Sequence, residues 1–88
     1  MGIDIVWSSN GWEDFEFWLD NDRKKMRKIR ELIRACKMNP FDGIGKPEPL
    51  KENLSGSWSR RIDTEHRLVY YFEEDTLYIV SCRHHYEK

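Results

Sequence analysis

The feature that most constrains the fold is an apolar stripe on a strongly basic segment, residues 23–37. Its apolar members recur at spacings of three and four, which places them on one face of a helix. They are Met26, Ile29, Leu32, Ile33 and Cys36. The other positions include eight Lys or Arg residues and one acidic residue, Glu31. Asn39-Pro40 ends the pattern, because the residue before a proline avoids helical geometry. One face of this helix therefore needs a covering layer, and the other belongs in water.

A second helix is predicted immediately before the basic one. Its apolar residues recur at helical spacing and are Trp12, Phe15, Trp18 and Leu19. Asn10, with Glu13 three residues later, is predicted to cap its start. Asp22 is a favourable N-cap for the basic helix, so the joint between the two helices is very short. Helices joined this closely are expected to form an antiparallel hairpin.

Strands are predicted on both sides of the helices. Residues 3–7 alternate between apolar and polar positions, as a strand does. Three further strands are predicted at 58–62, 66–72 and 76–83, and the turns at 63–65 and 73–75 are short enough for an antiparallel meander. Residues 41–57 are rich in Gly and Pro and are predicted to be mostly loop. A helical hairpin covering one face of this antiparallel sheet is an α+β fold.

Length and composition narrow the class of protein. Eighty-eight residues suffice for one hydrophobic core, so a single domain over 1–88 is expected. No apolar run approaches the ~20 residues that span a bilayer, and the first residues lack the basic and apolar regions of a signal peptide. A cytoplasmic protein with no membrane association is therefore expected. Cys36 and Cys82 are too few for a disulfide framework and are expected to be buried free thiols.

Charge is distributed unevenly along the chain. Residues 1–22 carry six acidic side chains and no Lys or Arg, whereas residues 23–37 are strongly basic. Such polarity can steer a polyanion to one side of a molecule. A solvated helix face beside an acidic neighbour explains the same pattern without any function.

Several common functional motifs are missing. Gly43-Ile44-Gly45-Lys46 does not match a phosphate-binding or dinucleotide-binding loop, and no nucleophile elbow is present. Cys82, His84 and His85 crowd onto one predicted strand end, where they do not close a tetrahedral metal site. No metal and no cofactor are therefore predicted.

Acid, base and cation types are concentrated in residues 46–86. Glu48 lies between two prolines that restrict its backbone, and His85 and Tyr86 follow the last predicted strand. The cations are Lys46, Lys51, Arg60, Arg61, Arg67 and Arg83. RNA cleavage by internal transesterification needs a base, an acid and a cation for the phosphate, and these residue types supply all three.

A purely structural explanation of the same residues also stands. Arg61 and Arg67 would then pair with Asp63 or Glu65 at a turn, and His66 would be a solvent-facing strand residue. The aromatic residues would be core or half-core groups that do not stack on bases, namely Trp58, Tyr70, Tyr71 and Tyr78.

Longer motifs distinguish the chain from other small domains. In order, they are Asn39-Pro40-Phe41, Gly45-Lys46-Pro47-Glu48-Pro49-Leu50-Lys51, Asn53-Leu54-Ser55-Gly56, Trp58-Ser59-Arg60-Arg61-Ile62, Glu65-His66-Arg67-Leu68-Val69-Tyr70 and Cys82-Arg83-His84-His85-Tyr86. Together they resemble the YoeB branch of the RelE toxin superfamily. The resemblance continues upstream through Trp7-Ser8 and Trp12-Glu13-Asp14, so it covers nearly the whole chain.

The resemblance implies a bacterial toxin of a toxin–antitoxin pair with a fold related to small microbial ribonucleases. Such toxins are endoribonucleases that bind the ribosomal A site and cut the mRNA exposed there. The implied partners are a cognate antitoxin of the YefM type, the rRNA and mRNA of the ribosome, and a second copy of the chain in a homodimer. The alternatives are a non-catalytic ribosome blocker and an inactive relative that acts as an antitoxin-bound transcriptional co-repressor.

The resemblance also implies roles for individual residues. By motif, Glu48 corresponds to the general base, Arg67 to the cation that stabilises the phosphate, and His85 to the general acid. Tyr86 corresponds to the group that stacks on or orients the substrate, and Lys51 and Arg61 are implied as supporting phosphate contacts.

Overall fold

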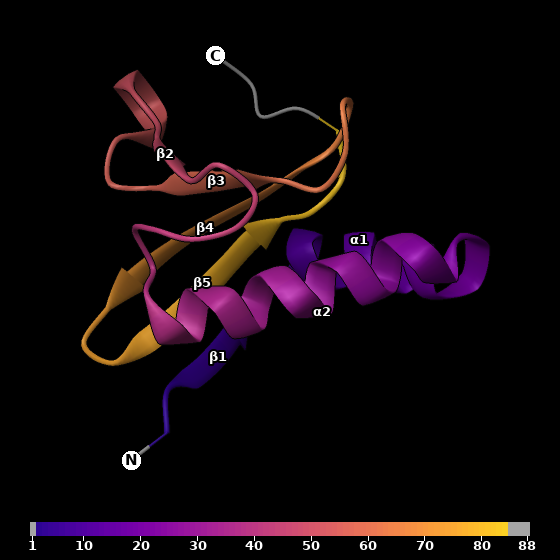
Figure 1. The fold of residues 1–88 in the computed structure, drawn as a ribbon, viewed down its shortest axis with the longest axis horizontal. Coiled ribbons are helices and arrows are strands. Elements are labelled where there is room, and N and C mark those ends of the chain that lie inside the picture. The colour runs from indigo at the N-terminus through magenta and orange to yellow at the C-terminus, as the bar shows by residue number, and fades with distance from the viewer. Residues whose placement is uncertain (1, 85–88) are drawn as a thin grey trace.

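The computed structural model describes residues 2–84, and Figure 1 shows the order of its elements. They are β1 (Asp4–Trp7), α1 (Ser9–Asn21), α2 (Arg23–Met38), β2 (Glu48–Pro49), a 3₁₀ turn (Glu52–Leu54), β3 (Trp58–Arg61), β4 (Arg67–Glu73) and β5 (Thr76–Ser81). The predicted α+β class and the helical hairpin, with Asp22 as its joint, are confirmed. Within the described part of the chain, no helix is long and apolar enough to cross a membrane.

The five strands form one sheet in the order β1-β5-β4-β3-β2. Strands β3, β4 and β5 pair antiparallel, as predicted for the meander. β2 was not predicted, because it lies in the region expected to be mostly loop, and it pairs antiparallel with β3. β1 differs, because it pairs parallel to β5 and makes the sheet mixed. The helical hairpin between β1 and the later strands provides the long crossover that parallel neighbours need. The last strand also ends earlier than predicted, at Ser81, because the backbone of Cys82 bonds to side chains of α1 instead.

The N-cap predicted for α2 is confirmed, and the N-cap predicted for α1 is not. Asp22 accepts hydrogen bonds from the backbone N–H groups of Lys24 and Lys25, so its predicted role as N-cap is confirmed. The prediction for Asn10 was wrong, because α1 begins earlier and Ser8 is its N-cap. Ser8 Oγ accepts from Gly11 N at 2.8 Å and donates to Val80 O at 2.7 Å. One hydroxyl therefore both starts α1 and ties it to β5.

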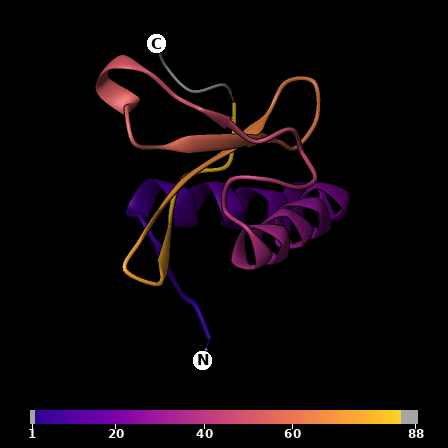
Figure 2. The same cartoon turned by 60° about the vertical axis from the view of Figure 1, so that its left-hand side comes forward.

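The core lies between the helices and one face of the sheet, an arrangement that can be followed in Figures 1 and 2. All five residues of the predicted stripe on α2 are buried, and they meet Leu68, Tyr70, Leu77 and Ile79 of the sheet. Cys36 and Cys82 are buried free thiols, as predicted. Burial raises the pKa of both thiols above the ordinary value, which leaves them poor nucleophiles.

Arg60 fixes the loop that leads from α2 to β2. Its side chain is fully buried, and Nε donates to Tyr70 Oη at 3.0 Å. The guanidinium also donates to three backbone carbonyls of the loop, those of Asn39, Asp42 and Ile44. Tyr70 Oη in turn donates to Pro40 O, and burial raises the Tyr70 pKa to about 12. Arg60 is therefore a structural residue, and the inclusion of Arg60 among the candidate cations was wrong.

Candidate active site

Strand register places four polar residues on the face of the sheet that the helices do not cover. Glu48 of β2 lies opposite Ser59 of β3, and Arg61 of β3 lies opposite Arg67 of β4. Residues directly opposite each other on neighbouring strands share a face, and so do alternate residues of one strand. Arg60 points the other way, toward the core. The pairing of the two-residue strand β2 thus brings Glu48 beside a residue 19 positions away in the sequence.

Arg67 is the best-fixed member of this group. Its Nε donates to Ser59 Oγ at 2.9 Å, and its Nη2 lies 3.3 Å from Glu48 Oε1. The side chain of Arg67 is only 10% exposed, whereas that of Glu48 is 51% exposed. A cation held at the base of a site and a carboxylate open to solvent beside it can bind a phosphate and accept a proton. Ser59, which sequence reasoning overlooked, orients the guanidinium.

Among the described residues, positive charge exceeds negative charge around this pair. Arg61 and Arg67 lie directly opposite each other, an unfavourable arrangement for like charges unless an anion is near. Glu48 balances one of them, and Arg61 has no carboxylate within ion-pair distance among residues 2–84. The predicted alternative pairing of Arg61 or Arg67 with Asp63 or Glu65 is wrong. Asp63 pairs with Lys25 at 3.0 Å, and Glu65 Oε1 lies 3.7 Å from His66 Nε2. The surplus charge favours an anionic ligand on this face.

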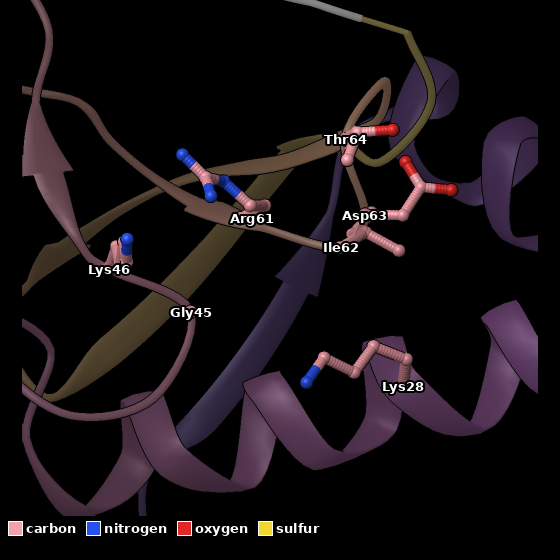
Figure 3. A pocket seen from close by; sticks show the side chains of 7 residues that line it. All are labelled: Lys28, Gly45, Lys46, Arg61, Ile62, Asp63 and Thr64. Carbon is pink, nitrogen blue, oxygen red and sulfur yellow. The ribbon is translucent and has the colours of Figure 1, made fainter.

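A hollow of about 390 Å³ adjoins Arg61. Figure 3 shows three cationic side chains around it, from three segments of the chain. They are Lys28 of α2, Lys46 of the loop and Arg61 of β3. Asp63 also lines the hollow, but Lys25 already neutralises it. Lys28 lies 3.8 Å from Glu31, which offsets its charge. Among the side chains that the structure describes, Lys46 and Arg61 therefore supply the unpaired positive charge at this hollow.

His66 takes part in the structure in a way that its sequence position does not indicate. It is only 8% exposed, so the prediction of a solvent-facing residue was wrong. Its Nδ1 accepts a hydrogen bond from His84 N at 2.7 Å. The carbonyl of His84 accepts from Arg67 N at 3.1 Å. His84, the last described residue, is thus hydrogen-bonded to both His66 and Arg67.

The remaining predicted residues are less informative. His85 and Tyr86 lie outside the described residues. Lys51 is exposed and precedes the 3₁₀ turn, with no ion pair to another described residue. The predicted core or half-core role is confirmed for Tyr70, which is fully buried, and for Trp58, which packs against the core. Tyr71 and Tyr78 are half-buried and stack on each other instead. Across residues 2–84, no group of three His, Cys, Asp or Glu side chains could hold a metal ion.

Comparison with known proteins places the chain in one family. Residues 7–86 match the model of the YoeB-like toxin of bacterial type II toxin–antitoxin systems. Toxin YoeB of Escherichia coli strain K12 is 52% identical over 82 residues, which are 93% of this chain and 98% of that protein. The solved YoeB/ParE toxin from Agrobacterium tumefaciens is 46% identical and superposes with a TM-score of 0.93 over 96% of this chain and 100% of that one.

Two structures from Staphylococcus aureus show assemblies of similar proteins. A YoeB dimer from that organism is 44% identical and has a TM-score of 0.91 over 98% of this chain and 100% of that one. A YoeB from that organism is also solved in a heterotetrameric YoeB–YefM toxin–antitoxin complex, with 44% identity, a TM-score of 0.89 and the same coverage. These assemblies belong to the relative.

Proposed function

The chain belongs to the family of YoeB-like toxins of bacterial type II toxin–antitoxin systems, and from that premise we propose that it is a ribosome-dependent endoribonuclease. It cuts the mRNA exposed in the ribosomal A site and so halts translation in the cytoplasm. The reaction is an acid–base transesterification carried out by side chains, with no cofactor.

The proposed reaction assigns one step to each group. The Glu48 carboxylate takes the proton of the 2′-hydroxyl as that oxygen attacks the neighbouring phosphorus. The Arg67 guanidinium neutralises the negative charge that accumulates on the pentacoordinate phosphate. The bond to the 5′-oxygen then breaks as the His85 imidazolium gives it a proton. The products are a 2′,3′-cyclic phosphate and a 5′-hydroxyl end, and Tyr86 orients the base by stacking.

The observation that carries the proposal is the arrangement around Arg67. The guanidinium is held by Ser59 and lies 3.3 Å from a half-exposed carboxylate, that of Glu48. The backbone N–H of the same arginine bonds to His84, the residue that precedes His85 in the sequence. The proposed base and the proposed cation thus lie side by side, and the cation is hydrogen-bonded to the residue that precedes the proposed acid in the sequence.

The basic face of α2 supports binding to the ribosome. Its exposed cations are Arg23, Lys24, Arg27, Arg30, Arg34 and Lys37. Together with Lys28, Lys46, Lys51 and Arg61 they offer rRNA and mRNA a contact that depends on phosphates and tolerates many sequences. Binding to the ribosome is therefore expected to weaken steeply with salt.

The partners of the S. aureus relative suggest partners for this chain. We expect a YefM-type antitoxin whose acidic segment folds on this cationic surface. A homodimer is expected as well. The exposed Trp12 and Leu19 of α1, with Val6 of β1, supply apolar surface of the kind that dimer contacts use.

The test is cleavage of a defined mRNA in a purified translation reaction. Wild type should produce cut mRNA that bears 2′,3′-cyclic phosphate ends. Glu48→Ala, Arg67→Ala and His85→Ala should each slow cleavage by on the order of 100-fold or more. Glu16→Ala, an exposed change on α1, is the matched control and should cut as wild type does. Intact mRNA with wild type, or full activity of His85→Ala, would contradict the proposal.

A second candidate function, favoured by the basic face of α2, is a ribosome blocker that does not cut RNA. This function predicts that translation is inhibited without cut mRNA ends. It also predicts that the double variant Arg27→Glu/Arg34→Glu loses more of the inhibition than His85→Ala does. An inactive relative that acts as an antitoxin-bound co-repressor is the third possibility. In that case, expression of the chain without antitoxin would leave growth unchanged.

A further inference from the structure

The segment Cys82–His84 has left the sheet, yet other elements hold each of its residues. Cys82 N donates to Asp14 Oδ2 at 3.0 Å, and Cys82 O accepts from Trp18 Nε1 at 2.8 Å. The guanidinium of Arg83 lies 3.5 Å from the ring centre of Phe17. Irregular segments near a chain end are poorly ordered unless they are tied down in this way. Side chains of α1 therefore keep the chain in place as it leaves β5.

His84 is the most constrained residue of this segment. Its φ is 65°, in the left-handed region that a residue with a side chain rarely adopts. Its N–H donates to His66 Nδ1, and its carbonyl accepts from Arg67 N. Strained backbone persists only where the surroundings enforce it, and it is concentrated near functional sites. These two bonds set the direction of the chain at His84.

His66 is built to act as one of these anchors. The ring packs edge-on against Trp18, with 4.8 Å between ring centroids, and is almost fully buried. Its backbone N–H donates to Asp63 Oδ1 at 2.7 Å, which fixes the residue as well as the ring. A backbone N–H can only donate, so Nδ1 must be the nitrogen without a proton. The ring therefore offers His84 an acceptor at one fixed point.

We propose that His66 is a positioning residue that sets how the chain enters His85 and Tyr86. It touches neither RNA nor the reacting atoms, and it acts through the backbone of His84. The inference rests on the proposed function, because it gives His66 a part in the same cleavage. Arg67 would then serve twice, with its guanidinium at the phosphate and its backbone N–H as the second anchor.

The test compares two substitutions of matched chemistry. His66→Asn keeps an acceptor at the place of Nδ1, whereas His66→Gln moves the acceptor to the place of Nε2. Cleavage by the Asn variant should stay within about threefold of wild type. The Gln variant should lose kcat by on the order of 100-fold, as a misplacement of about 1 Å can cause. KM should change by less than about twofold in both, since neither variant alters a substrate contact.

Hydrogen exchange at the His84 amide gives a readout independent of catalysis. In wild type and in His66→Asn this amide should be protected although it lies outside every helix and strand. In His66→Gln it should exchange up to about tenfold faster, as the loss of one hydrogen bond allows. Thermal unfolding of all three proteins separates a local release from general loss of the fold.

Several results would overturn the role of His66. An unprotected His84 amide in wild type would show that the anchor does not exist, whatever the variants do. Equal cleavage by wild type and His66→Gln, or equal losses in the Asn and Gln variants at unchanged melting temperature, would show that the acceptor does not position the site. If wild type itself leaves mRNA whole, the proposed function fails and this role in cleavage fails with it.

Discussion

Adjacent arginines in β3 show how differently one residue type can act. Arg60 is fully buried and bonds to Tyr70 and three loop carbonyls, while Arg61 is exposed opposite Arg67. A buried guanidinium needs nearly all of its donors satisfied, because an unpaired buried polar group is costly. Arg60 therefore stabilises the fold, whereas Arg61 contributes charge to the cationic face of the proposed site.

Substitution of these two arginines should separate stability from RNA binding. Arg60→Gln should lower the free energy of unfolding by about 2–4 kcal/mol, because loop carbonyls and the Tyr70 hydroxyl lose donors. Arg61→Gln should change it by no more than about 0.5 kcal/mol. Arg61→Gln should instead reduce the salt slope of ribosome binding by about 0.7–0.9, the value of one phosphate contact. Urea unfolding and salt titrations measure both quantities, and equal destabilisation by the two changes would contradict this division.

At the scale of elements, the loop between α2 and β3 decides where Glu48 lies. Arg60 holds its first part, and Gly45 O accepts from Arg61 N at 2.7 Å. Gly45 has φ of 83°, and a Cβ there would lie 2.8 Å from Leu32 Cδ2 and 3.1 Å from Arg60 Cβ. The loop is thus packed directly on the core just before β2 begins. Gly56, later in the same region, has φ of 96° but open space around it.

Two glycine substitutions should distinguish packing from backbone strain in this loop. Gly45→Ala should lower the free energy of unfolding by about 2–4 kcal/mol, because a left-handed backbone and a clash with buried Leu32 add together. Gly56→Ala should cost only about 1–2 kcal/mol, the backbone contribution alone. Urea unfolding gives both values. If Gly56→Ala proved the more damaging, the close packing of Gly45 on the core would be refuted.

The elements that follow a repeating pattern were predictable, and those fixed by tertiary pairing were not. Apolar spacing gave both helices and the meander. Strand alternation indicates that Arg60 and Arg61 face opposite sides of the sheet, but it does not tell which side faces the core. Because a buried arginine is uncommon, the sequence did not indicate that Arg60 is the buried one. The two-residue strand β2 is too short to show a pattern, so the proximity of Glu48 to Arg67 was implied only by the family resemblance. The acceptor role of His66 depends on a residue 18 positions away.

At the scale of the whole molecule, one charged contact ties the helices to the turn between β3 and β4. Lys25 Nζ lies 3.0 Å from Asp63 Oδ2 and 3.5 Å from Asp22 Oδ2. Partial burial by itself would raise the Asp63 pKa. Hydrogen bonds from the backbone of His66 and Glu65, together with the Lys25 charge, outweigh burial and lower it below 3.8. The same turn carries His66, so this contact supports the anchor of His84.

This contact makes stability depend on acid in a defined direction. A carboxylate whose pKa is lower in the folded than in the unfolded state stabilises the fold above the unfolded value, and that contribution is lost as pH falls through the folded value. The melting temperature should therefore drop from about pH 5 toward pH 2, and Asp63→Asn should make that drop shallower. Glu16→Gln, an exposed change on α1, should leave the slope as in wild type. Calorimetric scans across this pH range measure the slope of melting temperature against pH. A slope in Asp63→Asn equal to that of wild type would contradict the expectation.

The parallel pairing of β1 with β5 also governs when the molecule can take shape. β1 precedes every other described strand in the sequence, and its neighbour in the sheet is β5, the last strand described. The start of α1 likewise depends on Val80, through Ser8. During synthesis these early residues have nothing to pair with until residues 76–82 have emerged, so closure of the sheet is a late event built on distant contacts. A chain abandoned before that point has neither a closed sheet nor the Cys82–His84 segment, so the described fold is complete only after residues 76–84 have been made.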